Sequence, residues 1–456
     1  MTQDSLRRGL GLGSTVAIIV GYVIGASIFV LIGPLAFKTG PGLWVTYLLA
    51  SIPALFMCFT SSQLGSALPV TGANYVVVSR TMGPFWGYMT VWCMMITTLI
   101  GVPLVAYGFA DYLSFFIQGL PPMPTAIVIT LIFAAINVLG VNVMGWVQNI
   151  MVLVFMAAIV IFGLGGLVNI DPVNITPLNP NGWGAIVMAA IPAYFSYVGF
   201  MVITEMGGEI KNPARNIPRA ILIGFIVVLA AYFLVTFSLT GVMDWKTLEN
   251  TNAAVVEVSK VFLPGWVTLL IEIGALVAAF TTINAIIATG SRDIYAMAKD
   301  KVFPSWLAVA SPTTKTPYAA IAVITLLSII GILLGAGIEQ YAFITVMGVM
   351  AMHLKVALAV IRIKKRLPDH YEKAPFKLKG FWRVFWPAGV IVIAVIYILL
   401  GFAEAPVSVG LFFIAYLLGG LLFLERRWRL KRHGIDMAEI FEKDVDDVVA
   451  SASSGE

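Results

Sequence analysis

The stretch that decides the fold is Gly21-Tyr22-Val23-Ile24-Gly25-Ala26-Ser27-Ile28-Phe29, which lies in the first long hydrophobic segment. Glycine costs about 1 kcal/mol relative to alanine inside a helix, so two glycines in one membrane-spanning helix need a physical reason. One reason is a helix break between Ile24 and Ser27, which frees backbone groups that only a cavity or a bound solute can satisfy within a membrane. The other is a Gly-x-x-x-Gly contact that lets a second helix approach closely. This stretch alone leaves both open.

Composition places the chain in the membrane. Hydrophobic residues make up 60% of it and charged residues 11%, whereas soluble proteins carry about a quarter charged residues. Windows of about 20 apolar residues predict about twelve transmembrane helices and hence an all-α integral membrane protein. The windows are 14–37, 43–66, 85–113, 124–144, 146–168, 183–206, 217–243, 264–290, 317–336, 340–362, 384–403 and 407–425.

The basic residues predict the orientation. Of 28 Lys and Arg, only Lys38, Lys246 and Lys260 fall on the connections that follow odd-numbered spans. Because cytoplasmic loops are enriched in Lys and Arg, both termini are expected in the cytoplasm of a multi-pass plasma-membrane protein. Topology then accounts for the net charge of +5, and no nucleic-acid partner is expected.

A second interrupted span follows in the sixth segment, where Pro192 and Gly199 flank the run Ala193-Tyr194-Phe195-Ser196-Tyr197-Val198. Interrupted helices at corresponding positions of two halves indicate a midplane binding site in an inverted-repeat transporter. This recurrence favours the helix break over the simple packing contact in the first span. The predicted parts are an N-terminus (1–13), two five-helix repeats (14–168 and 169–363), a basic loop (364–383), helices 11 and 12 (384–425) and a C-terminal tail (426–456).

Four motifs then resemble those of permeases of the amino acid-polyamine-organocation (APC) superfamily. They occur in the order expected for that family and extend over roughly residues 10 to 305. The motifs are Ile24-Gly25-Ala26-Ser27-Ile28-Phe29, Pro69-Val70-Thr71-Gly72-Ala73-Asn74-Tyr75 with Gly83-Pro84-Phe85-Trp86-Gly87-Tyr88, Tyr197-Val198-Gly199-Phe200 with 209–219, and Ser291-Arg292-Asp293-Ile294-Tyr295-Ala296-Met297-Ala298-Lys299-Asp300.

The resemblance implies a LeuT-like 5+5 inverted repeat with broken helices 1 and 6 and two added C-terminal helices. It also implies secondary transport of a small amino acid or related amine by alternating access, and no enzymatic activity. A substrate carboxylate suits the free N–H groups at the start of a half-helix, and an ammonium group suits exposed carbonyls. By the family pattern, Phe195 is an aromatic gate. The expected substrate-binding residues are Ile24, Gly25, Ala26, Ser27, Phe195, Val198, Gly199, Met201 and Glu205.

Departures from the family pattern bear on specificity. Ser27 replaces a glycine of the signature, which narrows the pocket or adds a hydrogen-bond partner. Met201 stands where cation-handling relatives often carry Asp or Glu, but Glu205 follows one helical turn later. A carboxylate within a span is expensive and indicates function. Two functional roles for Glu205 are a counter-charge for an amine and a proton acceptor; the alternative is pairing with Lys211 or Arg215 at a water-filled mouth.

The sequence also bears on whether transport is coupled to the movement of an ion. Phe155 occupies a position where some proton-coupled relatives carry lysine, so coupling through that lysine is excluded. Hydroxyls of Thr281 and Thr282 in the eighth span are suited to a sodium ion, or they bond back to carbonyls of their own helix. The options are uncoupled exchange, coupling to protons through another group, and coupling to sodium. No cofactor and no other metal site is expected from two cysteines and three scattered histidines.

Several charged residues and segments cannot be given one definite role from the sequence. Lys355 is expected to extend its ammonium group to the cytoplasmic surface, and Glu272 to line an outer vestibule, without a named partner for either. Basic clusters after the tenth and twelfth spans suit contact with anionic membrane lipids. A substrate sensor built on a transporter fold is the remaining class of function. Substrate identity and oligomeric state do not follow from the sequence.

Overall fold

The protein is helical in the part that the computed structural model describes. That part is residues 10–434 without positions 26, 71, 115, 140–141, 208–209, 249–252, 300, 312–315 and 336, and with the backbone alone at 142–149 and 296. The α-helices are α1 Leu12–Ile24, α2 Ser27–Thr39, α3 Leu43–Ala67, α4 Ala73–Met82, α5 Pro84–Leu113, α6 Pro122–Leu139, α7 Asn142–Val168, α8 Gly182–Ala193, α9 Val202–Glu205, α10 Pro213–Val242, α11 Ala254–Phe262, α12 Gly265–Lys299, α13 Tyr318–Leu333, α14 Ile338–Arg366, α15 Pro368–Lys373, α16 Trp382–Glu404 and α17 Pro406–Arg432. The short 3₁₀ helices that lie wholly within the described residues are η1 Gly40–Gly42, η2 Tyr194–Tyr197, η4 Trp245–Leu248 and η5 Ser305–Ala308.

These helices match the expected spans. Ten apolar helical stretches within the described residues are long enough to cross a membrane, and one of them, Leu12–Ala67, contains α1, α2 and α3. The apolar helix α13 is shorter than this criterion requires but fills the expected ninth window. The prediction of an all-α, multi-span membrane protein is therefore confirmed. The division into two repeats at residue 168 stays a prediction.

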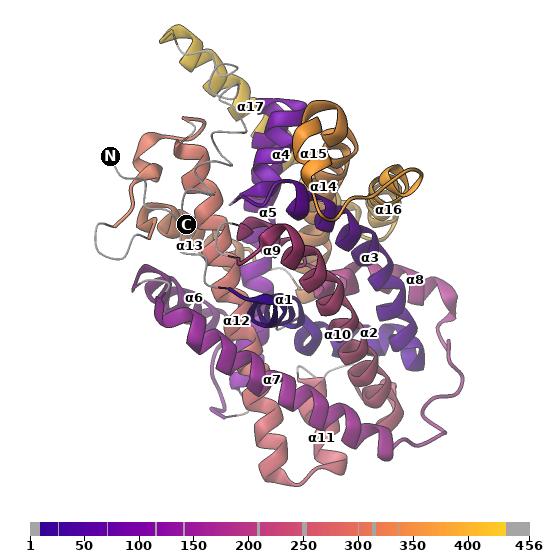
Figure 1. Cartoon of the computed structure of the whole chain (residues 1–456). Helices are drawn as coiled ribbons and strands as arrows, with labels where there is room; N and C mark the ends of the chain where they lie inside the picture. Colours follow the sequence, from indigo (N-terminus) through magenta and orange to yellow (C-terminus); the bar gives the residue numbers. More distant parts are fainter. Residues whose placement is uncertain are drawn as a thin grey trace.

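Helix α1 lies in the middle of the bundle (Figure 1). It packs against α7, α10 and α12, while α10 also packs along α3 and α5 packs against α12, α13 and α14. Long, continuous helices therefore surround the interrupted first span. A break in α1 is enclosed by protein, which is the condition under which free backbone groups are tolerated at membrane depth.

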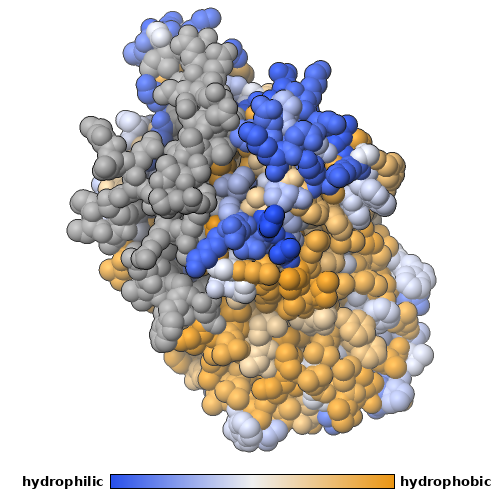
Figure 2. All heavy atoms as spheres, viewed as in Figure 1, coloured by the Kyte–Doolittle hydropathy of each residue, from blue (hydrophilic) through white to orange (hydrophobic). Residues whose placement is uncertain are grey.

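The surface separates into an apolar body and a polar end. Figure 2 shows a broad hydrophobic surface below a hydrophilic region at the end where α14 and α15 meet. Leu153 and Leu164 are 72% and 55% exposed on α7, as expected for side chains that face lipid. We call the end that carries the loop of residues 364–383 the basic end, because Lys364, Lys365 and Arg366 lead into it.

Small residues allow close contact between helices. A Cβ atom at Gly331 of α13 would lie 2.0 Å from the backbone oxygen of Leu99 in α5, so the two backbones touch there. By contrast, nothing lies within 4 Å of a Cβ atom at Gly420 of α17. In a membrane, helix association depends on such close packing, since lipid tails are as apolar as the side chains.

We expect Gly331→Ala to lower the free energy of unfolding by about 1–3 kcal/mol, because the added methyl group overlaps backbone that cannot move aside. Gly420→Ala is the matched control and is expected to be neutral or to stabilise by up to about 1 kcal/mol. Thermal unfolding of both purified variants in detergent measures the difference. Equal midpoints would contradict the close α5–α13 contact.

Candidate functional site

The first helix break lies at Gly25. Helix α1 ends at Ile24, α2 begins at Ser27, and Gly25 between them adopts φ −8° and ψ −154°. A Cβ atom on Gly25 would lie 1.8 Å from Oγ1 of Thr282 in α12. Both explanations of this glycine therefore hold, since the helix is broken and another helix also approaches closely. Ala26 lies outside the described residues.

The second break lies beside the first. Helix α8 ends at Ala193, the 3₁₀ turn η2 follows, and Gly199 has φ +138°, which side chains with a Cβ atom rarely adopt. A Cβ atom on Gly199 would lie 3.1 Å from Cγ2 of Val23 and 3.5 Å from the backbone oxygen of Tyr22. The sixth span thus contacts α1 through its own irregular segment, and the expectation of broken helices 1 and 6 is confirmed.

One tyrosine connects the two breaks. The hydroxyl group of Tyr232 in α10 lies 2.8 Å from the backbone oxygen of Val23 and 2.5 Å from that of Ser196, and is in position to donate to either. Val23 is in the last turn of α1, where carbonyls have no partner within the helix. Tyr232 is fully buried, and its ring packs edge-on against Tyr47 and Tyr197. The sequence analysis did not identify this residue.

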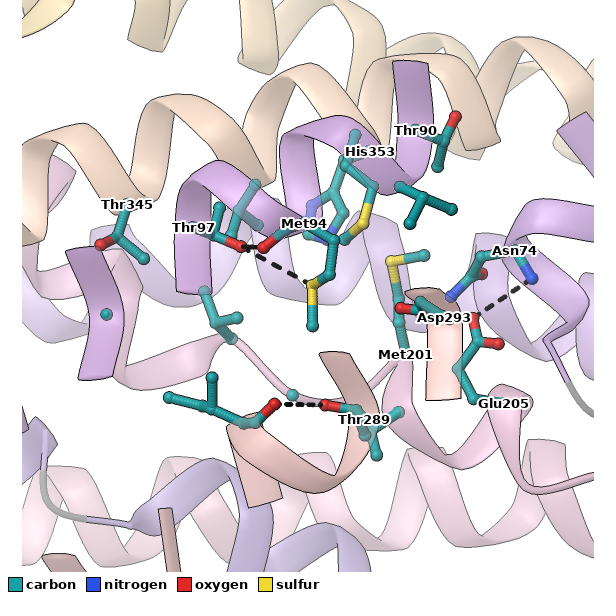
Figure 3. Close-up of a pocket in the computed structure, with 18 of the residues that line it drawn as sticks. Asn74, Thr90, Met94, Thr97, Met201, Glu205, Thr289, Asp293, Thr345 and His353 are labelled. Carbon is teal, nitrogen blue, oxygen red and sulfur yellow. Dashed lines mark hydrogen bonds between the residues drawn. The ribbon is translucent and has the colours of Figure 1, made fainter. Parts of the chain in front are cut away.

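A cavity of about 110 Å³ lies beside the second break, with walls from α4, α5, α9, α12 and α14 (Figure 3). The predicted site residues Phe195, Val198, Gly199, Met201 and Glu205 line it. Ile24, Gly25 and Ser27 are buried instead and are not among its lining residues. In this conformation the predicted residues of the sixth span line the cavity, whereas those of the first span lie beside it without lining it.

Other helices contribute residues that sequence reasoning missed. Asn74 of α4, Asp293 of α12 and His353 of α14 line the cavity, together with Thr97, Thr289 and Thr345. The His353 ring is buried, and its Nδ1 lies 3.1 Å from the hydroxyl group of Tyr194 in η2. Asp293 lies three residues beyond the expected end of the eighth span, and its hydropathy context therefore did not indicate a place in the site.

Glu205 is held at the start of α4. Its Oε1 accepts a hydrogen bond from the backbone N–H of Asn74 at 3.2 Å, and its backbone oxygen accepts one from Gly72 at 3.3 Å. Its Oε2 is inaccessible to solvent and has no hydrogen-bond partner among the described residues. Within the same set, neither Lys211 nor Arg215 forms an ion pair with it, so the alternative of such a pairing has no support there. A helix N-terminus stabilises such a carboxylate.

Of the residues considered for coupling, Glu205 lines the cavity, whereas Phe155, Thr281 and Thr282 are not among its lining residues. Phe155 is fully buried where α7 meets α12. Thr281 and Thr282 both donate to the carbonyl of Ala278, at 2.8 and 3.1 Å. Their hydroxyl groups therefore bond back to their own helix, which was the alternative to a sodium site. Glu272 is 8% exposed, and its Oε1 has no hydrogen-bond partner in the described part of the chain.

The expectation for Lys355 is wrong. Its side chain is 2% exposed, and its Nζ lies 3.3 Å from Sγ of Cys93 in α5 and 5.1 Å from the ring centre of Tyr416 in α17. The ammonium group therefore stays within the protein and does not extend to the surface. A thiol and an aromatic face supply the polar contacts that bulk water would otherwise provide.

Ion pairs fasten the end of the molecule opposite the basic end. Nζ of Lys38, in the last turn of α2, lies 3.1 Å from Oε1 of Glu339 in α14 and 2.5 Å from Oε1 of Glu404 in α16. The second half of the broken first span is thereby tied to two other helices.

Two adjoining broken helices, a cavity beside them and an apolar belt define the class of a membrane transporter. The chain belongs to the amino acid permease family, because the model of that family matches residues 10–423. This chain is therefore a transporter and not an enzyme, and the resemblance to APC permeases is confirmed.

Named relatives are similar along most of the chain. The branched-chain amino acid permease BcaP of Bacillus subtilis is 27% identical over 388 residues, which cover 80% of this chain and 83% of the relative. The methylthioribose transporter of the same organism is 27% identical, with 82% and 85% covered. Its serine/threonine exchanger SteT is 26% identical, with 85% and 91% covered.

We expect Tyr232→Phe to reduce transport at least fivefold and to lower the free energy of unfolding by about 1–3 kcal/mol, because it removes the hydroxyl donor that lies within reach of two backbone carbonyls at the breaks. Tyr107→Phe is the matched control, since Tyr107 donates to the carbonyl of Ile332 at 2.9 Å, away from both breaks. Uptake into proteoliposomes and thermal unfolding measure the two effects. If both variants lose transport equally, the link between the breaks has no special role.

Proposed function

We propose that the protein is a secondary active transporter that moves a small amino acid or a related amine across the plasma membrane by alternating access. The observation that carries this proposal is the cavity beside the second helix break, lined by Phe195, Val198 and Gly199. Ligand sites in transporters of this kind lie where interrupted helices meet. Both termini are placed in the cytoplasm, so the basic end is the cytoplasmic end.

The break geometry supports recognition of the α-amino acid group. Helix α2 begins at Ser27. The N-terminus of a helix attracts a carboxylate through its free N–H groups and the helix dipole. Carbonyls of Ile24, Phe195 and Val198 would accept from an ammonium group. Since the α1 break is covered by Thr282 in this conformation, substrate binding by Ser27 requires α1 and α12 to separate slightly.

Alternating access is supported by a difference between the two ends of the molecule, one of which is closed by ion pairs. Lys38 ties α2 to α14 and α16 at the outer end, while the cavity beside the second break reaches Asn74, Glu205 and Asp293. This arrangement suits a carrier that is closed to the outside. Opening the outer end would require the ion pairs of Lys38 to break.

An uncoupled exchanger of the same fold is the second candidate. Phe155 favours it, because a buried phenyl ring can neither carry a charge nor exchange a proton. Sodium coupling depends on Thr282, whose Oγ1 lies against Gly25 and keeps lone pairs while donating to Ala278. The names of BcaP and SteT describe a permease and an exchanger, so relatives of both kinds exist.

A thermal-shift screen of the purified protein with amino acids, polyamines and simple amines is expected to show stabilisation by the substrate class, because a ligand that binds the folded state raises its stability. Uptake into proteoliposomes, empty or preloaded with the best ligand, then separates the mechanisms. Uptake only into preloaded vesicles indicates exchange, and uptake driven by a proton or sodium gradient indicates coupling. Binding without any flux would point to a sensor, and absence of binding by all of these compounds would contradict the proposal.

If sodium is the coupling ion, Thr282→Ala is expected to reduce sodium-dependent uptake at least tenfold, because one oxygen ligand is lost. Thr325→Ala is the matched control, since Thr325 in α13 also donates to its own helix, at 2.8 Å to Ile321. Uptake measured with sodium and with choline checks this. Identical uptake in the two salts would exclude sodium coupling.

A further inference from the structure

The inner end of the cavity carries two carboxylates. Glu205 ends the short helix α9, and Asp293 lies in the last third of α12. Figure 3 shows both side chains at the same end of the cavity, next to Asn74. They come from the sixth and eighth spans, so the tertiary fold and not local sequence brings them together.

Neither carboxylate forms a salt bridge among the described residues, although the positive charge of Arg292 acts on Asp293. Arg292 directly precedes Asp293 in the chain. Glu205 is fixed through Oε1 by the N–H of Asn74, while its solvent-inaccessible Oε2 has no partner. Two carboxylates in an apolar interior require a nearby positive charge or a shared proton. The cavity beside them leaves room for a charged ligand group.

Between the second break and the carboxylates, the cavity wall is mainly apolar, with Thr289 as a polar group on α12. Met201 and Val202 lie on the sixth-span side, with Ile286 and Met352 contributed by α12 and α14. Methionine side chains adapt to flexible apolar ligands. A wall of this kind, with backbone polar groups at one end and carboxylates at the other, matches a methylene chain that carries a polar group at each end.

We propose that Glu205 and Asp293 form a subsite for the distal cation of the substrate, an ammonium or guanidinium group. The substrate class is then an amino acid with a long basic side chain, or an alkyl diamine. The α-amino group, or the near amine of a diamine, lies at the helix breaks, and the methylene chain lies along Met201 and Ile286. This inference rests on the proposed transport function and assigns to Asp293 a role in specificity.

The test compares basic and neutral ligands on the full-length protein. Thermal-shift titrations with lysine, arginine and putrescine, and with leucine, serine and threonine, give apparent dissociation constants. Asp293→Asn and Glu205→Gln keep the shape of each side chain and remove its charge. Each is expected to raise the dissociation constant of the basic ligands at least tenfold, as for loss of a charge-assisted hydrogen bond, and to change that of any bound neutral ligand less than twofold.

Controls separate charge at the site from general effects. Asp244→Asn removes a carboxylate from an exposed loop and is expected to leave every dissociation constant unchanged. Asp293→Glu restores the charge and is expected to recover at least half of the binding strength lost in Asp293→Asn. If Glu205→Gln unfolds, Asp293→Asn still tests the subsite, because the Asp293 carboxylate has no hydrogen bond among the described residues.

Other outcomes overturn the proposal in distinguishable ways. Stabilisation by neutral amino acids alone, unchanged in both variants, would remove the cation subsite and keep the proposed transport function. Equal loss of basic and neutral ligands, together with a flattened pH dependence of uptake, would identify the pair as a proton site. No response to any amino acid or amine would contradict the transport function itself.

Discussion

The structure depends on how backbone groups are satisfied where two helices are broken inside an apolar bundle. A peptide group left without a partner at membrane depth costs several kcal/mol. Here the two breaks lie against each other through Gly199 and Val23, and the hydroxyl group of Tyr232 lies between their carbonyls. Each break is therefore supported by the other and by α10. Neither irregular segment would be stable in an isolated helix that faced lipid.

The same constraint explains where the cavity lies. Because the sixth span turns at Gly199, the short helix α9 continues in a new direction and ends with Glu205 at the start of α4. The helix terminus stabilises one oxygen of the carboxylate, and the other is buried without a hydrogen-bond partner among the described residues. Long helices supply the remaining wall, which is mainly apolar. The positions of polar groups in this cavity thus follow from where helices end.

Much of the fold could be predicted from the sequence, because hydrophobic windows and glycine-containing interruptions are local signals. The breaks at Gly25 and Gly199 were predicted on that basis. Asp293 was not recognised as part of the site, because its approach to Glu205 depends on how α12 packs against the sixth span. Lys355 was misassigned for a similar reason, since its burial depends on Cys93 and Tyr416 from two other helices. The contact of Thr282 with Gly25 likewise depends on how the helices pack, and a hydropathy pattern does not predict it.

The fastening at Lys38 involves partly exposed charges, with side-chain exposures of 27% for Lys38, 39% for Glu339 and 31% for Glu404. Dissolved ions screen such pairs over a Debye length of about 8 Å at physiological ionic strength. The balance between the closed and open forms of that end therefore shifts with the salinity of the solution around it. Glu404 belongs to α16, one of the two helices beyond the predicted repeats, so this added helix helps to set how strongly the protein responds to its ionic surroundings.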